Sequence, residues 1–477
     1  MQQYLKKDWI ILFFFAFIFT IIYIIYYPPI SGIEDEIGFI NQAILWTHQK
    51  ITLDSPFLDG KFLGDIGEHN GHFVFIRNPL KSVTLLPFIW IKQLDGMFYS
   101  SLLIHLVLTV LCGLILLHFA ISPLYAIFLL LHPTLSLYSR TVMADTLAAA
   151  LLLGGLFFTI KSKKYGPFLS GMLIGLASLA RNHAAFALVF FSIFYFYFNL
   201  AKIDFKKGLI CFSSGLCFIL LAILYNFILF QSPFGLVDNV GTFHVSFFKE
   251  NIGLYALALA LIWPGMVIAP FFKFNKYTPL ISSIALFYLL FLLFYYYHDS
   301  SNNFFKNLII GPRLLQIALP FWCLSFILVL NRFLVKWKYF KPGLIFTATI
   351  LLFANFMLFK FHDQHLRELI EYKEIISNEI PENSVILSTK TLIKLFGIPK
   401  DDTQNYAWSY FTFSAKNLDY LYDELFTKSF YFAILLKEAN AFKIKCMNEF
   451  ANRHRLRLIK QYKHLYIFKN PHPIQRS

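Results

Sequence analysis

Three consecutive acids, Glu34, Asp35 and Glu36, follow the first apolar segment of the chain in PPISGIEDEIGFINQA. A carboxylate can accept a proton during a reaction or help to bind a cation. A helix that begins at this point gives a simpler reason for the acids, because negative charge is stabilised at a helix N-terminus. The residue types therefore leave a chemical and a structural interpretation open.

The pattern after the acids predicts an amphipathic helix over residues 33–48. Four isoleucines share one face at spacings of i, i+4, i+7 and i+11, namely Ile33, Ile37, Ile40 and Ile44. Such a helix can lie flat in the membrane interface with this face in the lipid. At about 100° per residue, Asp35 points away from the isoleucines and Glu36 lies at their flank. Asp35 is therefore the acid that we expect to face away from the membrane.

Charged and polar residues also interrupt three later apolar segments. Asp145 lies in SRTVMADTLAAALLL, and Arg181 and His183 lie in GMLIGLASLARNHAAFALVFF. Arg313 begins a further apolar run in GPRLLQIALPFW. Ionisable groups next to lipid are costly and usually face a cavity, so each is a functional candidate. The structural alternatives are a helix N-cap for Asp145 and interfacial snorkelling for the arginines.

The loop after the acids carries two more cations, Arg77 and Lys81, in GHFVFIRNPLKSVTLLP. Both can bind a phosphate or snorkel to the interface. Four histidines can serve as metal ligands, namely His69, His72, His183 and His244. No pair of them has the spacing of two ligands on one helix, so we expect surface or loop positions. Metal dependence stays open.

The composition is that of a membrane protein. Of the 477 residues, 57% are hydrophobic and 14% are charged, whereas about a quarter are charged in a soluble domain. The net charge of +15 comes mainly from Lys and Arg in short loops, as the positive-inside rule predicts, and does not indicate a nucleic-acid partner. Residues 9–27 form a span that we expect to be retained, because no cleavage site follows it. The five cysteines show neither metal spacing nor an obvious disulfide pair.

The apolar runs predict an all-α membrane domain of about eleven spans, of which residues 9–27 are the first. The others lie at 99–119, 124–138, 143–160, 167–180, 184–200, 208–230, 251–272, 277–297, 313–331 and 342–361. With the N-terminus in the cytoplasm, the dense basic clusters fall on the cytoplasmic side. The loop 28–98 and everything after residue 362 are then extracytoplasmic.

Residues 363–477 contain no run of membrane length. Short β-like runs, SVILST, YFAILL, LRLIKQY and LYIFK, alternate with helical stretches such as KNLDYLYDEL. This alternation predicts a small α/β domain. The predicted organisation is thus a transmembrane domain over 1–362, with interfacial helices in the outer loop 28–98, and an extracytoplasmic α/β domain over 363–477.

These segments together resemble the C-type polytopic membrane glycosyltransferases, which include the protein O-mannosyltransferases and the aminoarabinose transferases. The resemblance rests on the Asp35-Glu36 pair in the first outer loop and on the outer C-terminal domain. It also rests on four segments, GHFVFIRNPLKSVTLLP, SRTVMADTLAAALLLGG, LSGMLIGLASLARNHA and GPRLLQIALP. It runs over nearly the whole chain.

The resemblance implies transfer of a hexosyl or pentosyl group from a polyprenyl-phosphate donor to a lipid, glycan or protein acceptor at the outer face of the cell membrane. Asp35 would be the catalytic base, and Glu36 would hold the loop or assist a cation. Asp145 would help hold a cation or orient the acceptor, and His183 joins the substrate-binding candidates. The candidates to hold the donor phosphate are Arg77, Lys81, Arg181 and Arg313. A divalent cation is the one cofactor left open.

Two other functions fit part of the pattern. A flippase or transporter of lipid-linked glycans should place charges near the middle of its spans and be built from paired halves. The chain shows no internal repeat, and its ionisable groups gather at the predicted outer face, which favours surface chemistry. A glycan polymerase or ligase is a chemical neighbour of the transferase and stays open.

The loop and the C-terminal segment should be labelled from the same side of the membrane. We expect cysteines introduced into 28–98 and into 363–477 to react with an impermeant maleimide added to intact cells. Cysteines placed in the predicted cytoplasmic loops are the control. Labelling of only one of the two segments would contradict the predicted topology.

Overall fold

The computed structural model divides into two compact units. It describes residues 2–55, 57–58, 61–62, 66–162, 164–197, 204–233, 243–263, 265–295, 308–334, 340–381, 384–389, 392, 407–411, 431–435, 441–453 and 455–470. The first unit comprises Met1–Tyr27 and Asn78–Phe361, and the second Pro28–Arg77 and His362–Ser477. The sequence placed the whole loop 28–98 with the transmembrane domain. The contacts instead group its residues up to Arg77 with the C-terminal segment.

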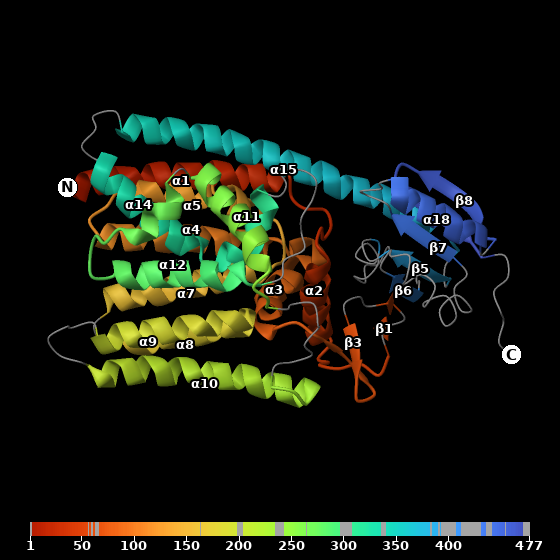
Figure 1. Cartoon of the computed structure of the whole chain (residues 1–477), viewed down its shortest axis with the longest axis horizontal. Helices are drawn as coiled ribbons and strands as arrows, with labels where there is room; N and C mark the ends of the chain where they lie inside the picture. Colours follow the sequence, from red (N-terminus) through yellow and green to blue (C-terminus); the bar gives the residue numbers. More distant parts are fainter. Residues whose placement is uncertain are drawn as a thin grey trace. The chain divides into compact units, whose positions relative to one another are not determined.

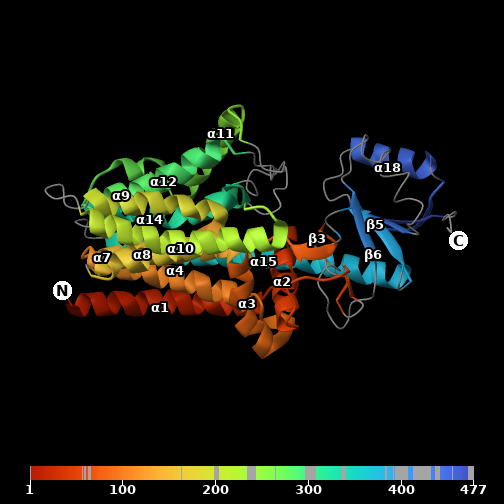
Figure 2. The same cartoon turned by 90° about the horizontal axis from the view of Figure 1, so that it is seen from below.

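The first unit is a bundle of α-helices (Figure 1). Its described helices are α1 (Gln2–Ile25), α3 (Pro79–Lys92), α4 (Tyr99–His118), α5 (Ile127–Leu130), α6 (Pro133–Tyr138), α7 (Asp145–Lys161), α8 (Gly166–Ala180), α9 (Ala187–Tyr197), α10 (Phe205–Phe230), α11 (Phe247–Ile262), α12 (Thr278–Leu293), α14 (Leu319–Leu334) and the first part of α15 (Phe340–Glu379). Short 3-10 segments are η1 (Gln93–Gly96), η2 (Pro123–Ala126), η3 (Asn182–Phe186), η4 (Met266–Phe271) and η5 (Gly311–Ile317). Figure 1 shows α4, α7 and α8 between α1 and α10, and Figure 2 shows the same bundle from below; α4 contacts α7, α7 contacts α8, and α8 contacts α10.

Among the described residues, four helices are long and apolar enough to cross a membrane. They lie in α1 (Lys6–Ile25), α4, α10 and α15. Residues of η5 and α14 form a fifth candidate, bent by 98°. Three further apolar helices are shorter, at Gly166–Ala180, Asn182–Tyr197 and Thr278–Leu293. The count of about eleven spans stays a prediction.

One predicted span is not a single helix. The run 124–138 is divided into η2, α5 and α6, with a break at His132 (φ −63°, ψ 119°). Pro133 accounts for the break, because proline disfavours the helical conformation of the residue before it and opens a new helix at its own position. Hydropathy alone does not register this effect.

Helices α8 and α10 approach closely through glycines. A Cβ atom added at Gly171 would collide with the carbonyl oxygen of Cys211, and one at Gly175 with that of Gly215. Gly171 and Gly175 are four residues apart, so they lie on the same side of α8. Small residues at this spacing let two helix backbones pack tightly within a membrane.

The second unit contains α2 (Glu34–Thr47), two hairpins and a mixed sheet. The hairpins pair β1 (Phe57–Leu58) with β2 (Lys61–Phe62) and β3 (Ile66–His69) with β4 (His72–Phe75). The sheet has the order β6-β5-β7-β9-β8, in which β5 is parallel to β6 and β7, and β9 is antiparallel to β7 and β8. Its elements are β5 (Val385–Thr389), β6 (Ala407–Phe411), β7 (Tyr431–Leu435), α18 (Ala441–Arg453), β8 (Arg457–Tyr462) and β9 (Leu465–Lys469).

The predicted strands SVILST, YFAILL, LRLIKQY and LYIFK correspond to β5, β7, β8 and β9. The predicted helical stretch KNLDYLYDEL lies outside the described residues. The last part of α15 packs its apolar face on the sheet, with Leu369, Tyr372 and Ile376 fully buried in the same cluster as β-strand side chains. Ile30 packs against this cluster, and Gly32 leaves room beside Leu366. The segment that leads into α2 is thereby held against α15.

We expect Gly171→Leu to destabilise the helix bundle by about 1–3 kcal/mol or more, because a side chain there overpacks the α8–α10 contact. The midpoint of thermal unfolding in detergent measures the effect. Gly253→Leu is the matched control, since no described atom lies within 4 Å of a Cβ at Gly253 in α11. Equal midpoints for the two variants would show that the close approach does not contribute to stability.

Candidate functional site

Glu36 fixes the chain at the start of α2. Its side chain is fully buried, and Oε2 accepts hydrogen bonds from Ser31 Oγ at 2.9 Å and from the N–H groups of Gly32 at 2.8 Å and Ile33 at 2.7 Å. Ile33 is the N-cap residue and Glu36 is at N3, the position from which a carboxylate reaches back to the N-cap amide. Bonds to an ionised acceptor are stronger than neutral ones, so Glu36 holds the loop in place.

Asp35 pairs with Arg77 at the other end of the described loop. Arg77 Nη2 lies 3.0 Å from Asp35 Oδ1, with 22% of the Arg77 side chain and 29% of the Asp35 side chain exposed. Gln42, two turns along α2, donates to the backbone oxygen of Arg77 at 3.3 Å. Of this pair of acids, Asp35 is accessible and Glu36 is enclosed, in agreement with the helix geometry read from the sequence.

The apolar face of α2 is covered by protein. Ile37 and Ile40 are fully buried and Ile44 is nearly so. The prediction that this face lies in lipid is therefore wrong. A period of 3.6 residues identifies an apolar face, but it does not tell whether lipid or protein covers that face.

A second charged group lies in the first unit, where Asp145 begins α7. The Asp145 side chain is fully buried, and its Oδ2 lies 2.6 Å from Nη2 of Arg181 at the end of α8. The N-cap position belongs to Ala144, so the N-cap interpretation of Asp145 is wrong. Within the described part of the chain, Oδ1 of Asp145 and Nε of Arg181 are buried without a hydrogen-bond partner. The pair thus has remaining capacity for a water or a ligand.

Segment η5 brings a third stretch to the start of α7. Nη2 of Arg313 lies 3.9 Å from Sδ of Met143, and Oε1 of the buried Gln316 accepts a hydrogen bond from Oγ1 of Thr146 at 3.1 Å. The segments around Asp145, Arg181 and Arg313 therefore meet, although they are far apart in sequence. Gln316 was not among the candidate residues predicted from the sequence. Its signal was an amide in an apolar run, three residues after Arg313.

His183 lies in η3 against aromatic residues of α12. Its ring stacks on Phe291 with centroids 6.1 Å apart, and its backbone oxygen accepts a hydrogen bond from Tyr288 at 3.0 Å. Its Nε2 is buried and has no hydrogen-bond partner among the described residues. The contacts give His183 a packing role beside Arg181.

Two other cations of the first unit are buried. Lys81 in α3 donates to Oγ of Ser101 at 2.9 Å, an enclosed position that does not fit a charge snorkelling to the interface. Arg140, which was not among the predicted candidates, donates to the carbonyl oxygen of Tyr26 and lies 4.8 Å from the centroid of the Phe359 ring. Its signal was a charge between two apolar runs in SRTVMAD.

His72 and His244 are both exposed. His72 Nδ1 is 3.2 Å from Asp54 Oδ1, and His244 Nδ1 is 2.7 Å from Ser246 Oγ. No group of three or more His, Cys, Asp or Glu residues within the described ranges is arranged to hold a metal ion.

The protein is similar to known proteins in structure but not in sequence. No protein-family model matches the chain, and no curated protein matches it in sequence. The structure of ArnT from Cupriavidus metallidurans bound to undecaprenyl phosphate aligns with a TM-score of 0.58 and 10% identity, covering 98% of this chain and 99% of that one. Its apo state gives 0.56 and 10% identity, covering 98% of each chain.

The archaeal oligosaccharyltransferase AglB from Archaeoglobus fulgidus, in complex with an inhibitory peptide and a dolichol-phosphate, aligns with a TM-score of 0.54 and 11% identity. The alignment covers 98% of this chain and 75% of that one. At these identities the likeness shows the fold. The chain has the fold of the C-type membrane glycosyltransferases, as the resemblance of its segments predicted.

We expect Asp145 and Arg181 to be strongly coupled in stability. Asp145→Ala or Arg181→Ala alone should cost about 3–5 kcal/mol, because each leaves a buried charge without its partner. The double variant should lose clearly less free energy of unfolding than the sum of the losses in the two single variants. Unfolding in detergent with chemical denaturant measures the three variants.

The exposed pair Lys445 and Glu449 on α18, with 3.8 Å between Nζ and Oε1, provides the control cycle. Its coupling should be about 0.3–0.5 kcal/mol. Additive effects at Asp145 and Arg181 would contradict the ion pair.

Proposed function

We propose that this protein is a membrane glycosyltransferase that moves a sugar from a polyprenyl-phosphate donor to an acceptor on the extracytoplasmic side. Its fold is shared with ArnT, solved with undecaprenyl phosphate, and with AglB, solved with a dolichol-phosphate. The observation that carries the proposal is the contrast within the acidic motif. Glu36 is enclosed by three hydrogen bonds, while the carboxylate of Asp35 is partly exposed to solvent.

In the proposed reaction, a hydroxyl oxygen of the acceptor forms a bond to the anomeric carbon of the sugar. The bond from that carbon to the phosphate oxygen breaks, and its electron pair leaves with the phosphate. The carboxylate of Asp35 accepts the hydroxyl proton as general base. The products are the glycosylated acceptor and the free polyprenyl phosphate. Arg77 positions the Asp35 carboxylate through the 3.0 Å contact.

The leaving phosphate needs positive charge, for which we propose Arg181 and Arg313. A guanidinium group has five N–H donors in a planar fork, so Arg181 can bind Asp145 and still donate to a phosphate oxygen. Its buried Nε, which has no hydrogen-bond partner among the described residues, supports this role. Asp145 then orients Arg181. Lys81 already donates to Ser101 in the interior, so we assign it a positioning role.

The described residues do not assemble a set of ligands for a divalent cation, so no step is assigned to one. In this proposal the transferred group is a hexosyl or pentosyl group, and the acceptor is a lipid, a glycan or a protein. A panel of polyprenyl-phosphate sugars incubated with the purified protein, with products followed by mass spectrometry, identifies the donor.

We expect Asp35→Asn to lower the turnover rate by about two to four orders of magnitude, because the side chain keeps its size and loses its basicity. The variant should bind the lipid donor as the wild type does, and its midpoint of thermal unfolding should stay near that of the wild type. Glycosyl transfer under saturating donor is the measurement.

Glu36→Gln is the matched comparison. It weakens the charge-assisted bonds to the loop, so we expect a lower thermal midpoint and a smaller loss of turnover. Near wild-type turnover of Asp35→Asn, together with an inactive but equally stable Glu36→Gln, would assign the base to Glu36. Full activity of both variants would mean that the acids only cap α2.

A further inference from the structure

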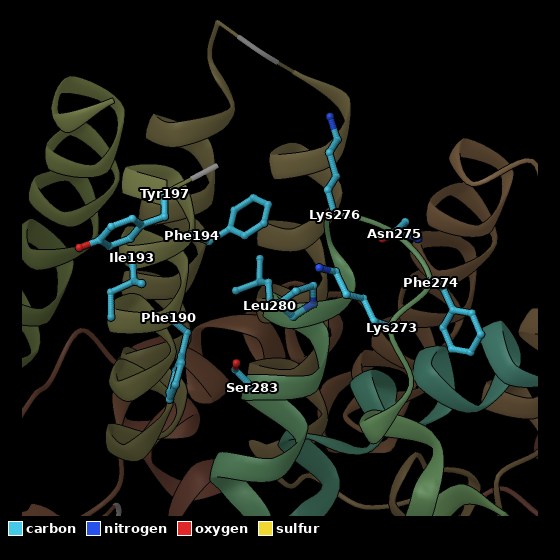
Figure 3. Close-up of a pocket in the computed structure, with 11 residues that line it drawn as sticks. Phe190, Ile193, Phe194, Tyr197, Lys273, Phe274, Asn275, Lys276, Leu280 and Ser283 are labelled. Atoms are coloured by element: carbon cyan, nitrogen blue, oxygen red, sulfur yellow. The ribbon is translucent and has the colours of Figure 1, made fainter. Parts of the chain in front are cut away.

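A pocket of about 600 Å³ lies between α9 and α12 in the first unit (Figure 3). Leu280 and Ser283 of α12 form part of its lining. On the other side, four side chains of α9 follow the spacing i, i+3, i+4 and i+7, so they share one helix face. They are Phe190, Ile193, Phe194 and Tyr197. The volume lies within the range of pockets that hold small organic ligands.

Two lysines stand at the pocket, in the turn that precedes α12. Lys273 and Lys276 are both exposed, and Figure 3 shows them across from the aromatic side chains of α9. The turn is ordered by reciprocal hydrogen bonds. Asn275 Oδ1 accepts from the N–H group of Thr278 at 3.1 Å, and Oγ1 of Thr278 accepts from the N–H group of Asn275 at 3.0 Å. The lysines are therefore presented from a fixed backbone.

The pocket is at the opposite end of the helix pair from the Asp145–Arg181 pair. On the side of the ion pair, Tyr288 of α12 donates to the backbone oxygen of His183, which is two residues after Arg181 in the sequence. At the other end, the rings of Phe194 and Tyr277 lie 5.7 Å apart. Tyr288 follows the lining residues Ser283 and Leu280 by five and eight residues, or about 8 and 12 Å along α12 at about 1.5 Å per residue. The pocket is thus separate from the residues assigned to the transfer reaction.

The lining combines apolar walls with positive charge. Ile193 and Tyr197 are 48% and 58% exposed, so the apolar wall continues to the surface of the unit. Of the described residues that line the pocket, none is acidic. Arg332 lies 5.6 Å from the ring centroid of Phe274, another lining residue, and adds a third cation. An apolar chain that carries a phosphate complements both properties.

We propose that this pocket binds an anionic phospholipid, with an acyl chain along the aromatic face of α9 and the phosphate at Lys273 and Lys276. An acyl chain between the two helices covers the apolar side chains that line the pocket and makes dispersion contacts with them. The lysines select a headgroup of net negative charge over a zwitterionic one, because the latter also carries a cation. The site does not depend on transferase activity, and it adds a lipid ligand to the polyprenyl-phosphate donor.

The test uses the purified full-length protein in lipid nanodiscs that contain equal amounts of phosphatidylglycerol and phosphatidylcholine. Native mass spectrometry after release into detergent counts the lipids retained on the protein. Wild type should retain phosphatidylglycerol preferentially. Lys273→Ala with Lys276→Ala should lower this preference by about fivefold per lysine, or about 25-fold in all. Ile193→Trp, which fills the pocket from an exposed position, should lower retention of both lipids.

Lys161→Ala with Lys164→Ala is the control, because it removes the same charge at exposed positions that do not line the pocket. Its phosphatidylglycerol preference should equal that of wild type. Equal retention in the control and in the Lys273/Lys276 double variant would overturn the proposal. Displacement of phosphatidylglycerol by undecaprenyl phosphate at equal concentration, lost in Ile193→Trp, would also overturn it and assign the pocket to the carrier lipid.

Discussion

A charge placed among apolar helices must be met by an opposite charge or by hydrogen bonds, and this constraint explains how the first unit is assembled around its polar residues. The carboxylate of Asp145 and the guanidinium of Arg181 are 2.6 Å apart, which joins the start of α7 to the end of α8. Lys81 is met by a hydroxyl of α4, and Arg140 by a carbonyl oxygen and an aromatic ring. A buried ion pair is no more stabilising than apolar packing of the same volume. Its cost is consistent with the phosphate-binding role that we propose for Arg181.

The acidic motif divides two tasks between neighbouring residues. Glu36 serves structure, since it binds the amides that precede α2, and Asp35 offers a carboxylate beside Arg77. Ile30 and Gly32, just before the motif, pack on the last part of α15. The acids are therefore positioned by the same unit that contains the five-stranded sheet. This arrangement gives the C-terminal segment a physical connection to the proposed catalytic residue.

The helix pair α9 and α12 has a different chemistry at each of its ends. One end lies beside Arg181 and His183, and the other carries the lysine turn and the apolar pocket. Basic residues at one end of membrane helices are usually explained by topology. An ordered turn next to an apolar pocket gives the same lysines the lipid-binding role that we propose, because one phospholipid can place its acyl chain in the pocket and its phosphate at the lysines.

The sequence by itself determined the apolar, mostly helical character of the chain and its likeness to the C-type membrane glycosyltransferase fold. Long apolar runs, dense basic loops and short segments in a fixed order are local properties. The sequence also predicted four of the five strands of the mixed sheet. The sequence also distinguished the directions in which Asp35 and Glu36 point, because the angle between successive residues of a helix is fixed. Only the tertiary structure decided the rest. It excluded the N-cap alternative for Asp145 and paired this residue with Arg181. It also buried isoleucines of α2, added Gln316 and Arg140, and divided the run 124–138. The physical reason is that partners and coverage come from segments far away in the chain, and periodicity within one segment contains no information about them.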